Sequence, residues 1–336
     1  MYWATKLVTD PKSETGDKLE YLNILRRADQ KRFKMELAQT QTNLTSHPQG
    51  VYLLTRWMNT HDLAHEAVQW YRTLPDEIRK DASVQMASAE SLMAQKDWKA
   101  LRERTYKGDW QQLDFLRKAM LARSLRELGL DVESRIYWQQ ALGEARRSSQ
   151  TVAMLSDLAD HWQWDDEAEE LWWLIARGPV DQQRALRSLY QLYSKRGNTI
   201  RLLLVVSRSF QLDPKDETAK NNVAMYSLLT GKDLETAYRY AKELYQAHPQ
   251  DPAFISTQAF SLHIQGRTDE AVKLMKTLPD KVLETPAFAL YEGIFLAADG
   301  QPEAAKKYLN LGKRAEPMLP EERQLLTDAL QRVNKP

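Results

Sequence analysis

The stretch of sequence that decides the fold occurs twice, as EAVQWYRTLPDEI at 66–78 and as EAVKLMKTLPDKV at 270–282. The alanine in second place is Ala67 in one copy and Ala271 in the other, and the two are 204 positions apart, which is six times 34. A period of 34 residues is typical of arrays of helix–turn–helix repeats. The sequence therefore predicts an all-α chain built from repeated helix pairs.

The same period runs through most of the chain. Small or apolar residues, which we call anchors, recur at intervals of 33 to 35 positions: Ala67, Leu101, Ser134, Ala168, Leu202, Ala237, Ala271 and Ala305. Glycines precede most anchors by five or six positions, where a left-handed residue can end a helix and begin a tight turn: Gly129, Gly197, Gly231, Gly266 and Gly300. Each repeat is therefore predicted as a first helix (helix A), a turn, and a second helix (helix B) that carries the anchor. In three repeats Asp62, Lys96 and Gln163 stand near the place of the glycine.

The repeated pattern resembles the tetratricopeptide repeat family. The segments that match best are GKDLETAYRYAKELYQAHPQDP at 231–252, IQGRTDEAVKLMKTLP at 264–279 and GQPEAAKKYLNLGKRAEP at 300–317. The resemblance covers about residues 47–318 and implies a right-handed superhelical α-solenoid. It further implies that helix A of each repeat lines a concave groove that binds peptides or protein surfaces, and it implies no reaction.

The chain is expected to have three parts. Residues 1–46 form an N-terminal segment, with helical spacing of apolar residues over 15–45. Residues 47–318 form about eight repeats. Residues 319–336 form a capping helix over the exposed end of the stack, because a proline and two acids begin this segment as they often begin helices.

Composition excludes several classes of function. The chain has 47 basic and 46 acidic residues in 336, and a net charge of +1 does not suit a nucleic-acid binder, which needs a positive excess. It has no cysteine, so disulfides, thiol nucleophiles and thiolate metal sites are excluded. No apolar run is long enough to span a bilayer.

The compartment stays open. Tyr2, Trp3 and Lys6 resemble the interfacial end of a membrane helix. A cytoplasmic location is favoured, and a membrane-anchored or periplasmic domain, with membrane contact through the N-terminus alone, is the alternative.

No residues with catalytic or metal-binding spacing are found. His61 and His65 are four apart, but the glutamate follows the second histidine, which does not match the zinc-protease pattern, and a third ligand is lacking. Trp162 and Trp164, beside a run of acids, are interpreted as packing residues. We expect no enzymatic activity, no cofactor and no metal.

The helix-A register of the resembled family assigns a candidate peptide-binding groove. Its middle is rich in arginine, which grips carboxylates with two hydrogen bonds, and its C-terminal third is apolar and suited to a hydrophobic helix. The candidate groove residues are Arg56, Arg123, Arg126, Arg184, Arg187, Asn221, Met225, Phe260, Leu290 and Ile294. The alternative for the arginines is ion pairing with acids of neighbouring helices.

Two functions follow. The first is a protein–protein interaction scaffold that binds an acidic and apolar segment of a protein or peptide partner in the groove. The second is a structural component that self-associates into a homo-oligomer through its convex face or through 15–45. In one form of this hypothesis, the chain is the soluble part of a membrane-anchored protein.

Overall fold

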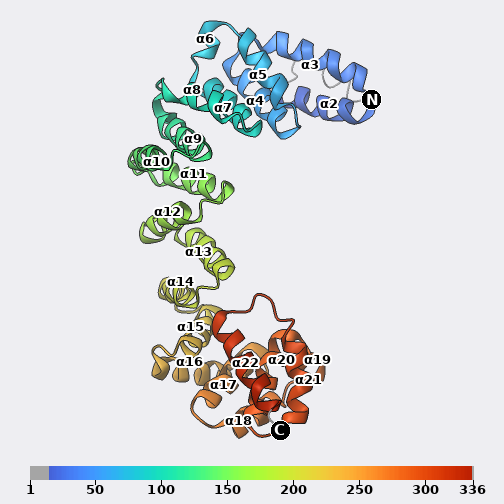
Figure 1. Cartoon of the computed structure of the whole chain (residues 1–336), viewed down its shortest axis with the longest axis vertical. Coiled ribbons are helices and arrows are strands. Elements are labelled where there is room, and N and C mark those ends of the chain that lie inside the picture. Colours follow the sequence, from blue (N-terminus) through green and yellow to red (C-terminus); the bar gives the residue numbers. More distant parts are fainter. Residues whose placement is uncertain (1–14, 335–336) are drawn as a thin grey trace. The chain divides into compact units, whose positions relative to one another are not determined.

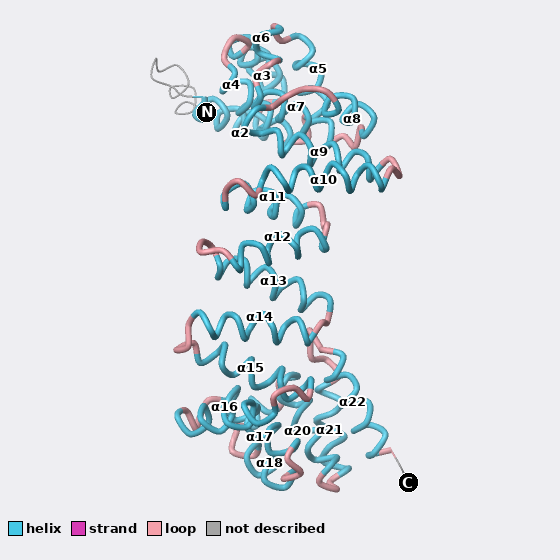
Figure 2. The backbone as a smooth tube through the Cα atoms, turned by 90° about the vertical axis from the view of Figure 1, so that its left-hand side faces the viewer, coloured by secondary structure: helices cyan, strands magenta, loops and turns pink. Residues whose placement is uncertain are grey.

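In the computed structural model, which describes residues 15–334, every regular element is a helix and no strand occurs (Figures 1 and 2). The described residues up to Leu155 form one compact unit, and those from Ser156 onward form a second. Within residues 15–334, no helix combines the length and the apolar character needed to cross a membrane. Tyr2, Trp3 and Lys6 lie outside the described residues.

The first unit begins with two helices that precede the repeats. The sequence suggested continuous helical spacing over 15–45, but the segment is broken at Asp29, whose carboxylate accepts a 3.0 Å hydrogen bond from the amide of Arg32 and caps the second helix. Both helices pack on the first repeat. The helices of this unit are α2 (Thr15–Ala28), α3 (Gln30–Leu44), α4 (Pro48–Thr60), α5 (Ala64–Thr73), α6 (Asp76–Arg79), α7 (Ala82–Ala94), α8 (Trp98–Tyr106), the 3₁₀ turn η1 (Gln111–Leu113), α9 (Asp114–Glu127) and α10 (Asp131–Ala145).

Helix α11 (Ser149–His161) crosses from the first unit into the second. The second unit continues with α12 (Asp165–Arg177), α13 (Gln182–Arg196), α14 (Thr199–Leu212), α15 (Glu217–Thr230), α16 (Leu234–Ala247), α17 (Pro252–Ile264), α18 (Thr268–Met275), α19 (Asp280–Leu283), α20 (Pro286–Ala298), α21 (Pro302–Gly312) and α22 (Pro320–Val333). The predicted all-α repeat fold is confirmed by these helices. Helix A and helix B of the successive repeats are α4/α5, α7/α8, α9/α10, α11/α12, α13/α14, α15/α16, α17/α18 and α20/α21.

The anchors hold each pair together. All eight lie on helix B and are at most 1% exposed. Small residues also bring the helices of a pair into close contact, most clearly at Gly293 of α20. A β-carbon there would lie 2.7 Å from the backbone nitrogen of Leu309 on α21. Only glycine permits this approach, because real β-carbons do not come within 3.0 Å of another heavy atom.

The turn between helix A and helix B has the same conformation in all eight repeats. The five predicted glycines have φ between 60° and 81°, and Asp62, Lys96 and Gln163 adopt φ of 61°, 56° and 58° at the corresponding positions. The left-handed conformation is therefore imposed by the repeat geometry, and three repeats adopt it without glycine.

The duplicated stretch also folds in the same way twice. Helix B ends at Thr73 in α5 and at Met275 in α18, shortly before the proline of each copy. Pro75 and Pro279 then precede the single-turn helices α6 and α19. Each stretch is therefore a helix B, a proline break and a further helical turn, where the sequence indicated helix B alone. The break follows because proline lacks an amide hydrogen and disfavours helix at the residue before it.

Candidate functional site

Two of the candidate groove arginines in the first unit are already engaged with neighbours. Arg56 on α4 pairs with Glu90 on α7 at 3.5 Å, and burial raises the pKa of that carboxyl group. Arg123 on α9 pairs with Glu127 on the same helix at 2.8 Å and lies over the ring of Trp98. Ion pairing with an acid of a neighbouring helix, the alternative interpretation from sequence, therefore describes Arg56, whereas Arg123 pairs within its own helix. Arg126 is half-buried and also interacts within the chain.

The second unit presents arginines on α13. Arg184 is exposed, hydrogen-bonds Asp157 on α11 at 2.5 Å and lies 5.4 Å from the ring of Trp172. Arg187, three residues on, is exposed, and within residues 15–334 its guanidinium has no hydrogen bond or ion pair. A bidentate ligand such as a carboxylate could reach Arg187 without breaking a contact.

The apolar third of the candidate groove is not an open surface. Phe260, Leu290 and Ile294 are 1%, 1% and 4% exposed, Asn221 is buried, and Met225 is half-buried. The expectation that these residues face a free groove is wrong, because Phe260, Leu290 and Ile294 belong to one hydrophobic core of the second unit and Met225 packs against it. Asn221 is buried as well.

The C-terminal helix α22 completes that core. It contacts α20 and α21, as a cap on the last repeat would, and it also contacts α15, the first helix of a repeat two earlier (Figures 1 and 2). Its side chains Leu326, Ala329 and Val333 share the core with Phe260 and Ile294. The helix thus covers helix-A residues as well as the end of the stack.

Polar contacts fix the start of α22. The hydroxyl of Tyr291 on α20 donates a 2.6 Å hydrogen bond to Glu322, whose other oxygen accepts a 2.8 Å bond from the amide of Leu319. The neighbouring Glu321 accepts a hydrogen bond from the hydroxyl of Thr199, the first residue of α14. Pro320 lies against Gly197 in the turn before α14.

Sequence reasoning missed these contacts. The LPEE segment at 319–322 indicates a helix start, because an acid three residues after the first position can cap the backbone there. Nothing in the sequence pairs it with Tyr291 or Thr199, since the partners of a capping acid depend on where the helix docks.

Three tyrosines converge near this point. The hydroxyl groups of Tyr190 on α13 and Tyr226 on α15 are 2.7 Å apart. Burial, then the hydrogen bond with Tyr190 and the charge of Glu322, raise the pKa of Tyr226 well above its ordinary value. Burial and Glu322 do the same to the pKa of Tyr291. Within residues 15–334, Glu322 therefore accepts hydrogen bonds from the neutral hydroxyl of Tyr291 and from a backbone amide, and it forms no salt bridge.

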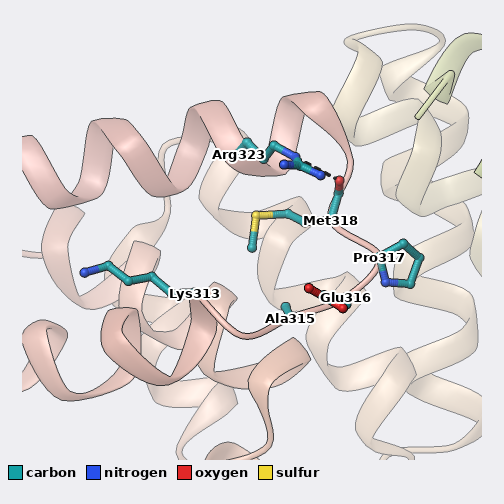
Figure 3. Close-up of a pocket in the computed structure, with 6 residues that line it drawn as sticks. All are labelled: Lys313, Ala315, Glu316, Pro317, Met318 and Arg323. Atoms are coloured by element: carbon teal, nitrogen blue, oxygen red, sulfur yellow. Dashed lines mark hydrogen bonds between the residues drawn. The ribbon is translucent and has the colours of Figure 1, made fainter. Parts of the chain in front are cut away.

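A surface pocket of about 530 Å³ lies under the segment that joins α21 to α22. Its lining includes Lys313, Glu316, Met318 and Arg323 (Figure 3), and Arg323 donates a 3.2 Å hydrogen bond to the carbonyl of Met318. The charged residues of this pocket are exposed, so it has the character of a loop cavity and lacks a buried polar group to bind a ligand.

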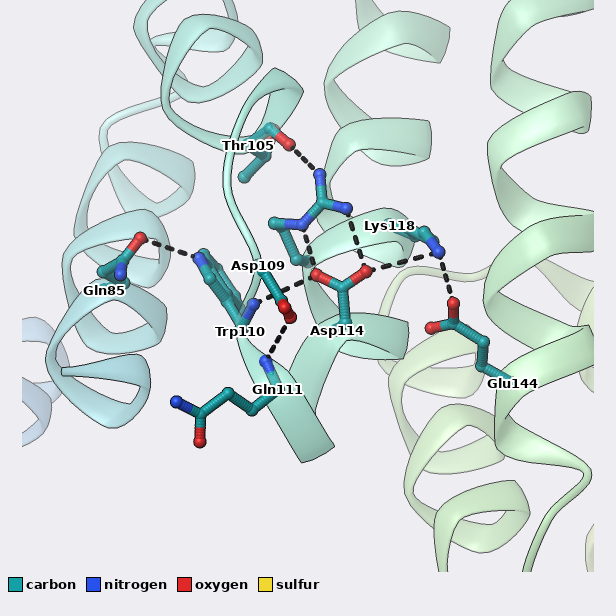
Figure 4. A network of polar contacts seen from close by, with 9 residues as sticks. Gln85, Thr105, Asp109, Trp110, Gln111, Asp114, Lys118 and Glu144 are labelled. Atoms are coloured by element: carbon teal, nitrogen blue, oxygen red, sulfur yellow. Dashed lines mark hydrogen bonds and ion pairs between the residues drawn. The ribbon is translucent and has the colours of Figure 1, made fainter. Parts of the chain in front are cut away.

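A polar network in the first unit is structural. Asp114 at the start of α9 accepts two hydrogen bonds from Arg117 and one from the amide of Trp110, which hold the pKa of Asp114 at about 2 against the opposing effect of burial (Figure 4). Arg117 also donates to the carbonyl of Thr105, and Lys118 pairs with Glu144 on α10. Each charge has a partner, so the network fastens α8, α9 and α10 together.

The tryptophans and histidines singled out in the sequence contact other side chains of the first and second units. Trp162 and Trp164 are buried and meet edge to face with ring centroids 5.2 Å apart. The ring of His61 stacks on Trp57, and Nδ1 of His65 lies 3.4 Å from Gln95. Among residues 15–334, no group of three histidine or acidic side chains is placed to hold a metal ion.

The sequence matches no family model. It also matches no curated protein. Solved structures that resemble the chain include a tetratricopeptide repeat protein from Parabacteroides merdae, with 14% identity, a TM-score of 0.39, and coverage of 76% of this chain and 99% of that one.

PilW, a widely conserved type IV pilus biogenesis factor, is 17% identical, with a TM-score of 0.36 and coverage of 63% of this chain and 98% of its own. The Cut9–Hcn1 hetero-tetramer of the APC/C gives 14% identity and a TM-score of 0.34, covering 98% of this chain and 80% of that one. By its own helix pairs and left-handed turns, this chain is an α-helical repeat protein.

Proposed function

We propose that the protein is a protein–protein interaction scaffold, which binds a segment of a partner on the helix-A side of its second unit. The observation that supports this most directly is α22, because a helix of the chain itself docks on α15 and α20 through an apolar stripe and an acidic first turn. An amphipathic helix that lies with its apolar face in a hydrophobic groove is a recurrent mode of protein recognition.

The exposed arginines of α13 supply the polar part of the proposed surface. Arg187 is open to a carboxylate, and Arg184 could exchange its exposed partner Asp157 for one. An exposed ion pair contributes little to stability, so such an exchange costs little.

The test uses charge reversal on α13. Partners would be identified by cross-linking in cells, and one would then be purified and titrated against the wild-type protein and an R184E/R187E variant. We expect the variant to bind at least about tenfold more weakly, as the loss of buried interfacial arginines commonly does. The control is R201E/R239E, which makes the same change of charge at exposed residues of helix-B helices α14 and α16. Equal affinity of all three proteins would contradict binding through α13.

A second candidate, self-association, has a separate observation in its favour. Helix B of two repeats exposes apolar side chains one turn apart: Ile200 and Leu204 on α14 are 55% and 47% exposed, and Val132 and Ile136 on α10 are 60% and 52% exposed. Exposed apolar pairs are typical of contact surfaces when they cluster. Sedimentation equilibrium of the wild-type protein and of I200D/L204D decides this: a wild-type oligomer that the variant abolishes supports it, and a wild-type monomer excludes it.

A further inference from the structure

The C-terminal helix α22 is held in a different way from the helices of the repeats. The two helices of a repeat are joined by a tight turn, whereas α22 is joined to α21 through 313–319, a segment without regular structure. Because α22 belongs to none of the helix pairs, it can leave its position without separating any helix A from its helix B. We call the surface on which it docks the α22-binding face. It consists of Thr199 and Tyr291, which hydrogen-bond α22, and of Leu228, Phe260 and Ile294, which share its hydrophobic core.

The contacts of α22 follow a regular pattern. An acid in the first turn, Glu322, is bound by the hydroxyl of Tyr291, and apolar residues follow at four, seven and eleven positions further on, at Leu326, Ala329 and Val333. These three lie along one face of the helix and are buried, while Thr327 and Gln331 on its other side are exposed. An amphipathic helix in a groove is recognised by anchors with this spacing.

The α22-binding face is itself built to receive such a helix. Phe260 and His263 of α17 and Tyr291 and Phe295 of α20 form an aromatic cluster, with ring centroids 5.1 to 6.5 Å apart. Two hydroxyl donors, on Thr199 and Tyr291, stand where the acidic first turn of the helix arrives. Aromatic rings supply apolar area at low cost in side-chain entropy, and the hydroxyl groups fix the register of the docked helix.

We propose that the α22-binding face is an exchangeable helix-binding site. Its external ligand is an amphipathic helix of a partner protein with the pattern of α22, an acid in the first turn followed by apolar residues at +4, +7 and +11. The helix α22 occupies the site until that partner helix replaces it. This proposal specifies which kind of partner the scaffold binds. It rests on the proposed scaffold function, which supposes that such a partner exists.

The attached helix sets a threshold for the partner. A segment tethered by a short linker competes at an effective concentration on the order of 1 mM. If the free helix binds the vacated site with a dissociation constant of about 10 μM, competition from the tethered α22 raises the apparent dissociation constant of an external helix by about a hundredfold. Only a helix that fits better than α22, or one held nearby by a second contact, would occupy the site.

The experiment uses the full chain and a synthetic peptide of residues 317–334 as the probe. The variant L326D/V333D places charges on the buried side of α22 and leaves the α22-binding face unchanged. The control T327D/Q331D places the same charges on the exposed side. Hydrogen exchange reports whether α22 is released, and fluorescence anisotropy of the labelled peptide reports binding.

We expect fast exchange of α22 in L326D/V333D, with protection retained in α15 and α20, and peptide affinity about a hundredfold above that of the wild-type protein and of T327D/Q331D. A peptide with its +4, +7 and +11 residues exchanged for serine should not bind. The proposal is overturned if release of α22 also unfolds α15 and α20, if the released protein does not bind the peptide, or if it pairs with a second copy through α22. None of these outcomes depends on Arg184 or Arg187, so failure of the scaffold function and failure of this site are separate results.

Discussion

The hydroxyl of Tyr291 on α20 lies 2.6 Å from a carboxylate oxygen of Glu322 on α22, and both residues belong to the part of the second unit where the last helix meets the repeats. Tyr291 is only 4% exposed, so the hydrogen bond is made away from bulk water. Hydrogen bonds to charged groups in such surroundings contribute more than neutral ones.

This contact can be measured with a double-mutant cycle of Y291F and E322A. We expect a coupling of about 1–2 kcal/mol in the free energy of opening α22, because each change alone removes the same hydrogen bond. Native-state hydrogen exchange of the α22 amides gives the four opening free energies. Additive effects of the two changes would show that the hydrogen bond does not hold the helix.

Replacement of glycine by alanine should have opposite effects on stability at Gly293 and at Gly143. G293A places a β-carbon 2.7 Å from the backbone of α21, which cannot move aside without separating the helices, so we expect a loss of about 2 kcal/mol or more in the free energy of unfolding. Gly143 on α10 has no atom within 4 Å of the corresponding position, and G143A should raise stability by about 0.5–1 kcal/mol. Urea denaturation of both variants tests the contrast, and a neutral G293A would mean that the helices separate easily.

The left-handed turn at Lys96 predicts that glycine is preferred there. An L-residue in this conformation costs about 1 kcal/mol, and K96G should therefore stabilise the first unit by up to about 1 kcal/mol. The control K34G makes the same exchange at an exposed position inside α3, where glycine disfavours the helix by about 1 kcal/mol. Thermal unfolding should move the two variants in opposite directions. A destabilised K96G would indicate that the lysine side chain contributes more than its backbone strain costs.

The carboxyl group of Glu292 predicts a dependence of stability on pH. It is 1% exposed, one of its oxygens lacks a hydrogen-bond partner within residues 15–334, and burial raises its pKa to about 7 from 4.5, against the weaker opposing effect of Lys276. Between these two values the folded protein binds more protons than the unfolded chain, so stability falls as pH rises, by about 3 kcal/mol in total.

The variant E292Q keeps the shape of the side chain and cannot ionise, so we expect this decline to disappear in urea titrations between pH 4.5 and 7.5. The control E303Q removes an exposed acid on α21 and should keep the decline. If the wild-type protein and E292Q show the same profile, Glu292 does not titrate in this range.

Much of the local structure could be predicted from the sequence, because the forces that set it act over a few residues. The 34-residue period located the helix pairs, and the anchors that it identified, such as Ala67 and Ala271, are buried as expected. Proline at 75 and 279 indicated where each helix B stops, although the extra helical turn after it was missed. The turns at Lys96 and Gln163 escaped the glycine pattern, because there the packing of the two helices imposes the backbone conformation.

Less of the candidate site could be predicted from the sequence. The helix-A register placed Phe260 and Ile294 on one apolar surface, and they do share one core. It could not show that α22 completes this core or that Arg56 pairs with Glu90 of another helix, because these contacts join residues far apart in the chain. The pair of Arg123 with Glu127, four residues further on, is local and was compatible with the sequence.

The sequence by itself determined the helices, their pairing and the amphipathic character of α22, since periodicity and helix-end residues are local properties. Only the tertiary structure decided where α22 goes. A helix with an apolar stripe can cover the last helix pair alone or also reach an earlier helix A, as α22 does, and both positions bury the same kind of surface. The choice is made by Thr199 and Tyr291, which receive Glu321 and Glu322 from 122 and 31 residues away.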